Sequence, residues 1–238
     1  MRPARRRQNL VFVAPDLIIF DCDGVLVDSE VISCRAHAET LTRHGYPITA
    51  EQVLERFLGR SMRQATLEVE AELGRSLPDD FQSQTYAEIF RLFATSLEAT
   101  PHIGEALTQI ALPVCVASSG PPEKISASLN RVGLYDRFAP YIFSAVQVRH
   151  GKPAPDLFLF AAEQMQTLPA RCLVIEDSIA GIAGAIAAGM PVLGFHGGSH
   201  CRPGYGDGLR AAGAAATFDD MRQLPGLIER IGAGLVTS

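Results

Sequence analysis

Two aspartates stand two positions apart at the end of an apolar run near the start of the chain. The run Leu17–Phe20 leads directly into Asp21 and Asp23, and Gly24 follows, where the chain can turn sharply. Side chains two positions apart on an extended strand project from the same side, so both carboxylates are expected to face one site. Two acids this close repel each other, which raises the pKa of one unless a cation stabilises its charged form. The spacing fits a carboxylate nucleophile on a metal ion beside a second carboxylate that shuttles a proton; the alternative is an ordinary strand-end turn.

A second pair of acids, Glu176 and Asp177, follows the apolar run 172–175 and precedes a predicted helix at 179–189. Carboxylates supplied by separate strand ends suit Mg²⁺, which prefers oxygen ligands in octahedral geometry and usually keeps some waters. Asp177 or Ser178 can also serve as the N-cap of the helix, and the two roles are compatible. The two acid pairs together therefore indicate a magnesium site between strand ends.

Groups suited to a phosphate lie between the two acid pairs. Ser118 and Ser119 stand before Gly120 at the end of another apolar run, and Lys152 lies in a loop before a helix. Hydroxyls and backbone N–H groups at a strand-to-helix turn suit a phosphate, because a helix N-terminus carries partial positive charge. Taken alone, the serines fit an ordinary turn and the lysine a solvated surface residue. Their expected place at the same sheet edge as the acids favours a phosphate site.

These residues need a scaffold that brings several strand ends to one edge. Short β-branched runs alternate with helical stretches, which is typical of a parallel sheet covered on both faces. The predicted strands occupy residues 17–20, 113–117, 141–144, 172–175 and 191–194, with a weaker one at 215–218. The predicted fold class is α/β, with a Rossmann-like parallel sheet.

The long interval between the first two strands is predicted to be helical, because its apolar residues recur at helical spacing. An insertion after the first strand of such a sheet emerges at its carboxyl end. The segment 29–100 is therefore expected to form a helical cap that excludes water and selects the substrate. Residues 1–28 and 101–238 are expected to form the α/β core.

Composition narrows the function classes. Apolar residues make up 47% of 238, enough for one well-filled core or a core with a small satellite domain. A net charge of −5 without basic clusters beyond the first seven residues gives no footprint for nucleic acid, so we interpret the arginine-rich start as a solvated tail. No segment approaches the ~20 apolar residues of a membrane span. We expect a monomer or weak dimer.

The cysteines are scattered and include no CxxC pair, which argues against a disulfide framework and a structural zinc site and favours the cytoplasm. His196, His200 and Cys201 could suggest another metal site. Such soft ligands favour zinc over magnesium, and no second cluster accompanies them. A glycine-rich loop beside the active site is the preferred interpretation.

Four motifs, in order, resemble those of the haloacid dehalogenase superfamily, in its branch with a helical cap after the first motif. They are FDCDGVLVDS, VASSG, GKPAPD and VIEDSIAGIAGAIAAGM, and the resemblance covers nearly the whole chain. The first two are similar to those of bacterial sugar-phosphate phosphatases, notably those acting on 6-phosphogluconate. The sequences KPAPD and EDS are also similar to those of β-phosphoglucomutases.

The resemblance implies a phosphatase mechanism. Asp21 would attack phosphorus and form an aspartyl phosphate, and Asp23 would act as general acid and base. The cofactor would be Mg²⁺, held by the Asp21 carboxylate, the Asp23 main-chain carbonyl and Asp177, with Glu176 as a direct or water-mediated ligand. Ser118, Ser119 and Lys152 would bind the phosphoryl group, and catalysis would rest on positioning and charge neutralisation.

The substrate implied is a small phosphorylated metabolite, such as a sugar acid or polyol phosphate. Cap arginines could grip a substrate carboxylate, or could be exposed helix residues. The candidates are Arg60, Arg63 and Arg35.

Three alternatives remain. A β-phosphoglucomutase-like activity is disfavoured because Ser33 stands where the mutase carries a cap histidine, and its cap arginine falls at or near Met62. Dehalogenation is remote, since dehalogenases lack the second aspartate. A non-catalytic phosphate-binding or partner-binding protein is disfavoured because every expected catalytic side chain is present.

Overall fold

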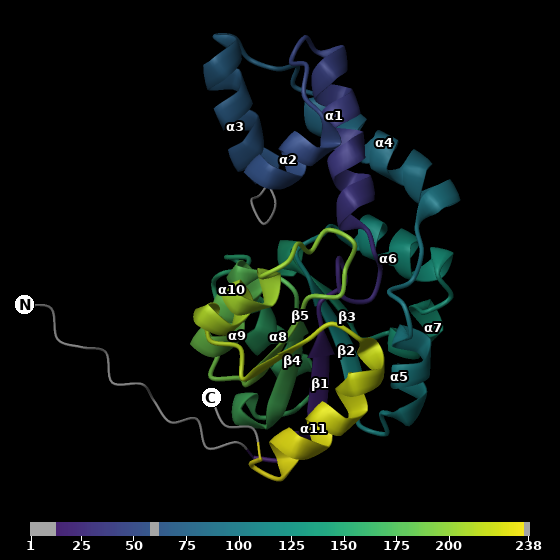
Figure 1. The fold of residues 1–238 in the computed structure, drawn as a ribbon, viewed down its shortest axis with the longest axis vertical. Coiled ribbons are helices and arrows are strands. Elements are labelled where there is room, and N and C mark those ends of the chain that lie inside the picture. Colours follow the sequence, from purple (N-terminus) through teal and green to yellow (C-terminus); the bar gives the residue numbers. More distant parts are fainter. Residues whose placement is uncertain (1–12, 58–61, 236–238) are drawn as a thin grey trace, which may run out of the picture.

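In the part of the chain that the structure describes, six parallel strands form one sheet in the order β3-β2-β1-β4-β5-β6. The computed structural model describes residues 13–57 and 62–235 (Figure 1), so the arginine-rich start and Arg60 lie outside the described residues. The strands are β1 (Leu17–Phe20), β2 (Val114–Ser118), β3 (Ile142–Ser144), β4 (Cys172–Glu176), β5 (Val192–Phe195) and β6 (Ala216–Phe218). The six predicted strands are confirmed, each end within one residue of its expected place.

The central strand β1 lies between β2 and β4. From β1 the chain builds outward through β2 and β3 and then crosses to the other side with β4, so the strand order reverses between β1 and β4. Ligands of open α/β sheets bind outside the carboxyl ends of the strands at such a point. Phe20 pairs in register with Ile175 there. The acids that follow these two residues, Asp21 and Glu176, consequently meet at the reversal.

Helices cover both faces of the sheet because side chains alternate along each strand. In β1, Ile18 and Phe20 pack into one core cluster, while Leu17 and Ile19 pack into the other. The first face carries α5 (Ile103–Gln109), α6 (Pro122–Arg131), α7 (Tyr135–Phe138) and α11 (Leu224–Gly232); the second carries α8 (Asp156–Gln164), α9 (Ile179–Ala187) and α10 (Tyr205–Ala212). The predicted α/β class is confirmed.

Between β1 and α5 the described residues form four helices, which make up a lobe beyond the carboxyl ends of the strands, called the cap here (Figure 1). They are α1 (Glu30–Arg43), α2 (Ala50–Phe57), α3 (Met62–Leu73) and α4 (Phe81–Ser96). The cap has its own apolar core, which includes Leu41, Val53, Val69 and Phe81. Ile89, Leu92 and Phe93 of α4 belong instead to the first core cluster of the sheet, so the cap also packs against the α/β core.

The two segments that join the cap to the sheet run side by side. Val27 forms an antiparallel bridge with Ala99, and Thr100 donates its backbone N–H to the Leu26 carbonyl at 3.1 Å.

Short 3₁₀ helices occur elsewhere, at Ala145–Gln147, Pro169–Arg171 and Met221–Gln223. Across the part of the chain that the structure describes, no helix has the length and apolar character needed to cross a membrane.

Candidate active site

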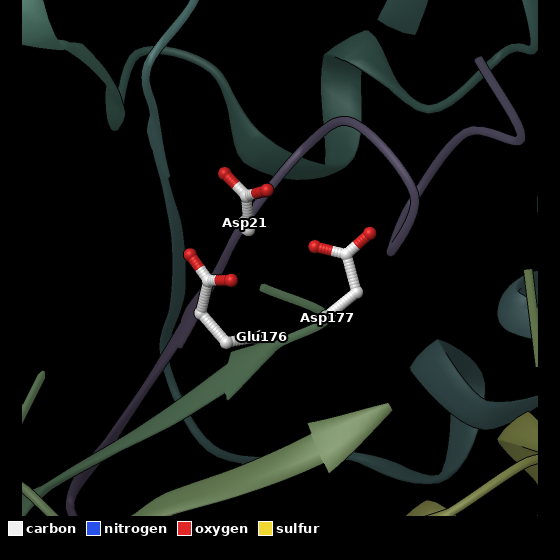
Figure 2. Close-up of side chains that lie close together, drawn as sticks. All are labelled: Asp21, Glu176 and Asp177. Atoms are coloured by element: carbon white, nitrogen blue, oxygen red, sulfur yellow. The ribbon is translucent and has the colours of Figure 1, made fainter. Parts of the chain in front are cut away.

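Three buried carboxylates converge at the carboxyl ends of β1 and β4. Figure 2 shows the side chains of Asp21, Glu176 and Asp177 gathered around one point. One oxygen from each lies within 4.8 Å of the others. Their exposed fractions are 7%, 0% and 5%, so little water screens their mutual repulsion. Such a group of hard oxygen donors is suited to a divalent cation.

Lys152 lies between two of these acids. Its Nζ is 2.7 Å from Asp21 Oδ1 and 2.6 Å from Glu176 Oε1. Burial would lower the pKa of Lys152, but the charges of Asp21 and Glu176 outweigh burial and raise it, so the ammonium is retained. Burial raises the pKa of Asp21 well above its ordinary value; Lys152 opposes the rise, while Glu176 and Asp177 add to it. A single ammonium therefore leaves the carboxylate cluster short of positive charge.

Asp23 has a different environment from Asp21. Its Oδ1 accepts hydrogen bonds from Ser29 Oγ at 2.6 Å and from Lys124 Nζ at 2.7 Å. Burial raises the pKa of Asp23, but the ion pair and hydrogen bond with Lys124 and the Ser29 hydrogen bond outweigh it, so this pKa lies below its ordinary value. The two neighbouring aspartates are thus pushed in opposite directions, as is common for acids with different roles.

Sequence reasoning missed Lys124, which lies in the first turn of α6. Its Nζ is 5.7 Å from the centre of the Phe93 ring of the cap, so this lysine contacts both lobes. The sequence feature that could have indicated Lys124 as a site residue is its place six residues after Ser118, in the helix that follows the expected phosphate-binding turn.

The serines of the second motif lie at the same edge. Ser118 is buried, and its Oγ accepts a hydrogen bond from the Gly120 N–H at 3.1 Å; Ser119 is exposed. Both line the cavity that contains Asp21, Asp23, Lys152 and Asp177. The expected phosphate-binding residues are therefore brought together with the acids.

Two glycines make room for the carboxylates. Gly24 has a φ of +76°, and a Cβ there would stand 1.8 Å from Asp177 Oδ2. A Cβ at Gly181 would stand 1.8 Å from Glu176 Oε1. Contacts this short are forbidden, so any side chain at either position has to displace the acid. The carboxylates thus lie in spaces that only glycine leaves open.

Ser178 connects Glu176 to the helix that follows. Its Oγ accepts a hydrogen bond from the Gly181 N–H at 3.0 Å, which makes Ser178 the N-cap of α9. Its N–H and Oγ both donate to Glu176 Oε2 at 2.9 Å. Since Glu176 Oε1 is bound to Lys152, both oxygens of Glu176 are engaged.

Asp21 and Asp177 retain oxygens for a cation. The structure records hydrogen bonds or ion pairs for Asp21 Oδ1 and Asp177 Oδ2, whereas within the described ranges 13–57 and 62–235 it records none for Asp21 Oδ2 or Asp177 Oδ1. All the donors are hard oxygens, so the residues present fit Mg²⁺. Among these same described residues, Asp21, Glu176 and Asp177 form the only group with metal-ligand spacing.

The glycine-rich loop after β5 places one histidine against the acids. His200 is buried, and its Nε2 lies 3.3 Å from Asp177 Oδ2 and 3.3 Å from Cys201 Sγ. Burial lowers the pKa of His200, but Asp177 and Cys201 outweigh it and raise that pKa to about 10. His196 lies against Gly206 of α10. The loop thus lies beside the site, where His200 orients Asp177, a contact that sequence reasoning did not assign.

A cavity of about 530 Å³ separates the acids from the cap. Its core side carries the residues described above, and its cap side is formed by residues of all four cap helices, among them Ser33, Met62 and Arg63. Arg35 does not line the cavity; it is exposed and bonded to Glu39 at 2.8 Å. Of the predicted cap arginines, Arg63 reaches the cavity, Arg35 points elsewhere and Arg60 lies outside the described residues.

A second cavity, of about 310 Å³, lies away from these acids. Its lining includes His102, Phe195, Asp219 and Asp220, and none of the predicted site residues. The chemistry is therefore assigned to the cavity under the cap.

Comparison with known proteins gives one consistent group. A family model for haloacid dehalogenase-like hydrolases matches residues 15–189. A 6-phosphogluconate phosphatase from Escherichia coli is 34% identical over 213 residues, which cover 89% of this chain and 94% of that protein. A haloacid dehalogenase-like protein of unknown function from Agrobacterium tumefaciens has a similar structure, with a TM-score of 0.81, 39% identity and coverage of 91% and 99% of the two chains. The structure of a candidate β-phosphoglucomutase from Thermotoga maritima is also similar, with a TM-score of 0.73 and 27% identity. The match covers 90% of this chain and 99% of that chain.

Proposed function

The chain belongs to the haloacid dehalogenase-like hydrolases and is a phosphoric monoester hydrolase acting on phosphorylated metabolites, and we propose that it is a magnesium-dependent phosphatase of small sugar or sugar-acid phosphates that works through an aspartyl phosphate on Asp21. The observation that carries the proposal is the meeting of Asp21, Asp23 and Lys152 with Ser118 on the floor of one capped cavity. These are a nucleophile, a proton carrier and two phosphate-binding groups within one enclosed space.

The proposed metal ligands are residues whose oxygen atoms remain available for coordination. The carboxylates of Asp21 and Asp177 and the main-chain carbonyl of Asp23 would hold Mg²⁺. Glu176 would act through water, because Lys152 and Ser178 already bind both of its oxygens. When bound, the ion supplies positive charge that offsets the charges of the carboxylates and the phosphoryl oxygens.

In the first step, a carboxylate oxygen of Asp21 attacks phosphorus while the bond between phosphorus and the substrate alcohol breaks. Lys152 orients this carboxylate through Oδ1 and, with Ser118, binds the phosphoryl oxygens. The leaving alcohol oxygen takes a proton from Asp23. The products of the step are a free alcohol and the aspartyl phosphate.

In the second step, water attacks phosphorus, gives a proton to Asp23, and displaces the Asp21 oxygen as inorganic phosphate forms. Lys124 influences whether Asp23 is protonated, because their ion pair favours the carboxylate form. An anionic phosphoryl group that enters beside Lys124 offsets this cation and raises the proton affinity of Asp23. Substrate entry therefore prepares Asp23 to act first as an acid.

The substrate class is supported by the relative that acts on 6-phosphogluconate and by the cavity size. A volume of about 530 Å³ lies in the range of roughly 300–1,000 Å³ that accommodates small molecules. Arg63, which lines the cavity, is the candidate contact for a substrate carboxylate.

We further propose a cytoplasmic protein, in keeping with its free cysteines, four of which are buried: Cys22, Cys34, Cys115 and Cys172. A monomer or weak dimer is proposed for its state in solution, and light scattering across a concentration series tests it.

The deciding experiment measures phosphate release from 6-phosphogluconate, fructose 1-phosphate and β-glucose 1-phosphate, with Mg²⁺ and with EDTA. We expect release by the wild type in Mg²⁺, and a loss greater than about 1,000-fold with EDTA or in Asp21→Asn. The matched control is Asp207→Asn, which changes an exposed aspartate of α10. Release that survives in Asp21→Asn excludes the mechanism; conversion of glucose 1-phosphate to glucose 6-phosphate without release identifies a mutase.

A further inference from the structure

Within the described parts of the chain, two residues on the cap side of the cavity each carry a polar atom without a hydrogen-bond partner. Ser33 Oγ and His37 Nε2 are both buried, and no partner for either lies among the residues that the structure describes. The two residues are four positions apart on α1, so they lie on the same face, one turn from each other. Both line the cavity above the acids. Two residues with unsatisfied polar groups thus line the same enclosed space.

Unpaired buried polar groups are uncommon because each costs about 1–3 kcal/mol in lost hydration. The surroundings of His37 offer no replacement: its ring centre is 6.0 Å from those of Phe57 and Phe81. The cap side of the cavity also carries the polar residues Arg63, Gln82 and Tyr86, but in the described structure none of them bonds to either atom. Since the described residues supply no partner, a molecule in the cavity is a source of the missing hydrogen bonds.

The chemistry of the pair defines what it can bind. Only 8% of His37 is exposed, and burial lowers the pKa of His37 to about 4, so its imidazole is neutral at neutral pH. A neutral imidazole nitrogen and a serine hydroxyl can each donate or accept a hydrogen bond. They suit uncharged hydroxyl groups, whereas the phosphoryl end of the substrate meets Lys152 and Lys124 on the core side. The core side of the cavity is therefore charged near the acids, whereas the Ser33–His37 pair on the cap side is neutral but polar.

We propose that Ser33 and His37 form a subsite that binds hydroxyl groups on the carbon chain of the substrate and selects polyhydroxylated monophosphates. This inference rests on the proposed phosphatase function and specifies its substrate class. Both residues lie in the first helix of the cap, which follows Asp21 and Asp23 closely in the chain.

The test compares a substrate series with variants of the pair. The series is glycerol 3-phosphate, erythritol 4-phosphate, ribitol 5-phosphate and sorbitol 6-phosphate, with p-nitrophenyl phosphate as a substrate without chain hydroxyls. For the wild type we expect kcat/KM to rise about 10-fold or more at the chain length that reaches α1, since one or two hydrogen bonds are gained. Ser33→Ala and His37→Leu should reduce that rise to about 3-fold or less, while His37→Gln, which retains a polar group, keeps part of it.

Arg35→Ala is the matched control, because Arg35 lies on the same helix but not in the cavity; it should keep the rise. Equal losses by the pair variants on every substrate, p-nitrophenyl phosphate included, would indicate a folding role alone and overturn the subsite, as would an unchanged rise.

A binding measurement separates failure of the subsite from failure of the phosphatase proposal. Calorimetry with sorbitol 6-phosphate is carried out on Asp21→Asn and on Asp21→Asn with His37→Leu. We expect about 10-fold weaker binding in the double variant. Equal dissociation constants overturn the subsite even where hydrolysis is observed. A difference in binding without hydrolysis by the wild type supports the subsite and rejects the phosphatase mechanism.

Discussion

The Nζ atom of Lys152 lies 2.7 Å from Asp21 Oδ1, although 131 residues separate the two in the chain. Only 4% of the lysine side chain is exposed, and it also binds Glu176. Removal of the ammonium in Lys152→Met leaves two buried carboxylates without their countercharge. We expect the free energy of unfolding to fall by about 3–5 kcal/mol and kcat/KM for a phosphate ester to fall about 100-fold or more. Urea denaturation and phosphate release measure the two effects.

The control for Lys152 is Arg171→Met, which removes a cation from the exposed ion pair with Asp16. Exposed pairs contribute about 0–1 kcal/mol, because solvent screens them and their side chains lose freedom. If both variants lose the same stability, the buried position of Lys152 has no special energetic role.

Magnesium should stabilise the folded chain through Asp177. A cation present at about 100 times its dissociation constant adds about 2.7 kcal/mol, which corresponds to about 5–10 °C in Tm for a chain of this size. We expect Mg²⁺ to raise the Tm of the wild type by this amount, EDTA to reverse the rise, and Asp177→Asn to remove most of it. Calorimetric or fluorescence melting checks this without any assay of activity.

The matched control for the melting experiment is Asp207→Asn, which neutralises an exposed aspartate and should keep the Mg²⁺ effect. An equal rise in Asp177→Asn would show that the ion binds elsewhere.

The space beside Glu176 can be tested with a pair of glycine substitutions. A methyl group at Gly181, in α9, would collide with the Glu176 carboxylate, whereas one at Gly208, in α10, would meet nothing within 4 Å. We expect Gly181→Ala to destabilise the fold by about 1–3 kcal/mol. Gly208→Ala should stabilise it by about 0.5–1 kcal/mol, because alanine loses less conformational entropy in a helix. Urea denaturation gives both values, and the collision has no energetic effect if the two variants shift in the same direction.

Much of the fold could be predicted because it depends on local pattern. Strands buried on both faces are mostly apolar, so the runs 17–20 and 172–175 were recognisable in the sequence, and the second strand extends one residue further, to Glu176. The parallel arrangement then required the acids at their ends to meet. The sequence predicted acids at one common edge, and the adjacency of β1 and β4 in the structure brings Asp21 together with Glu176 and Asp177.

The remaining parts of the site depend on side-chain direction, which sequence spacing does not provide. Lys124 is one of several polar residues on α6, and only the packing of that helix turns it toward Asp23. Arg35 and His37 are two positions apart on α1, but the helix places one outside and the other in the cavity. Glu176 could be identified from the sequence as an acid at the site, whereas its bonds to Lys152 and Ser178 could be recognised only in the structure.

The burial of His37 predicts a dependence of stability on pH. Its pKa is lowered from 6.5 to about 4 in the folded chain, because burial disfavours the imidazolium. Above pH 6.5 the imidazole is neutral in both states, so it contributes no dependence on pH. As the pH falls from 6.5 to 4 the unfolded chain takes up a proton that the folded chain does not, and the free energy of unfolding falls by about 1.4 kcal/mol per pH unit from this group. We expect His37→Leu to lose this part of the slope in urea denaturation measured at intervals across the window. His150→Leu, which removes an exposed imidazole and leaves His37 in place, should keep it. A wild-type slope in His37→Leu would show that His37 takes up its proton in the folded chain over the same pH range as in the unfolded chain, so that burial does not lower its pKa.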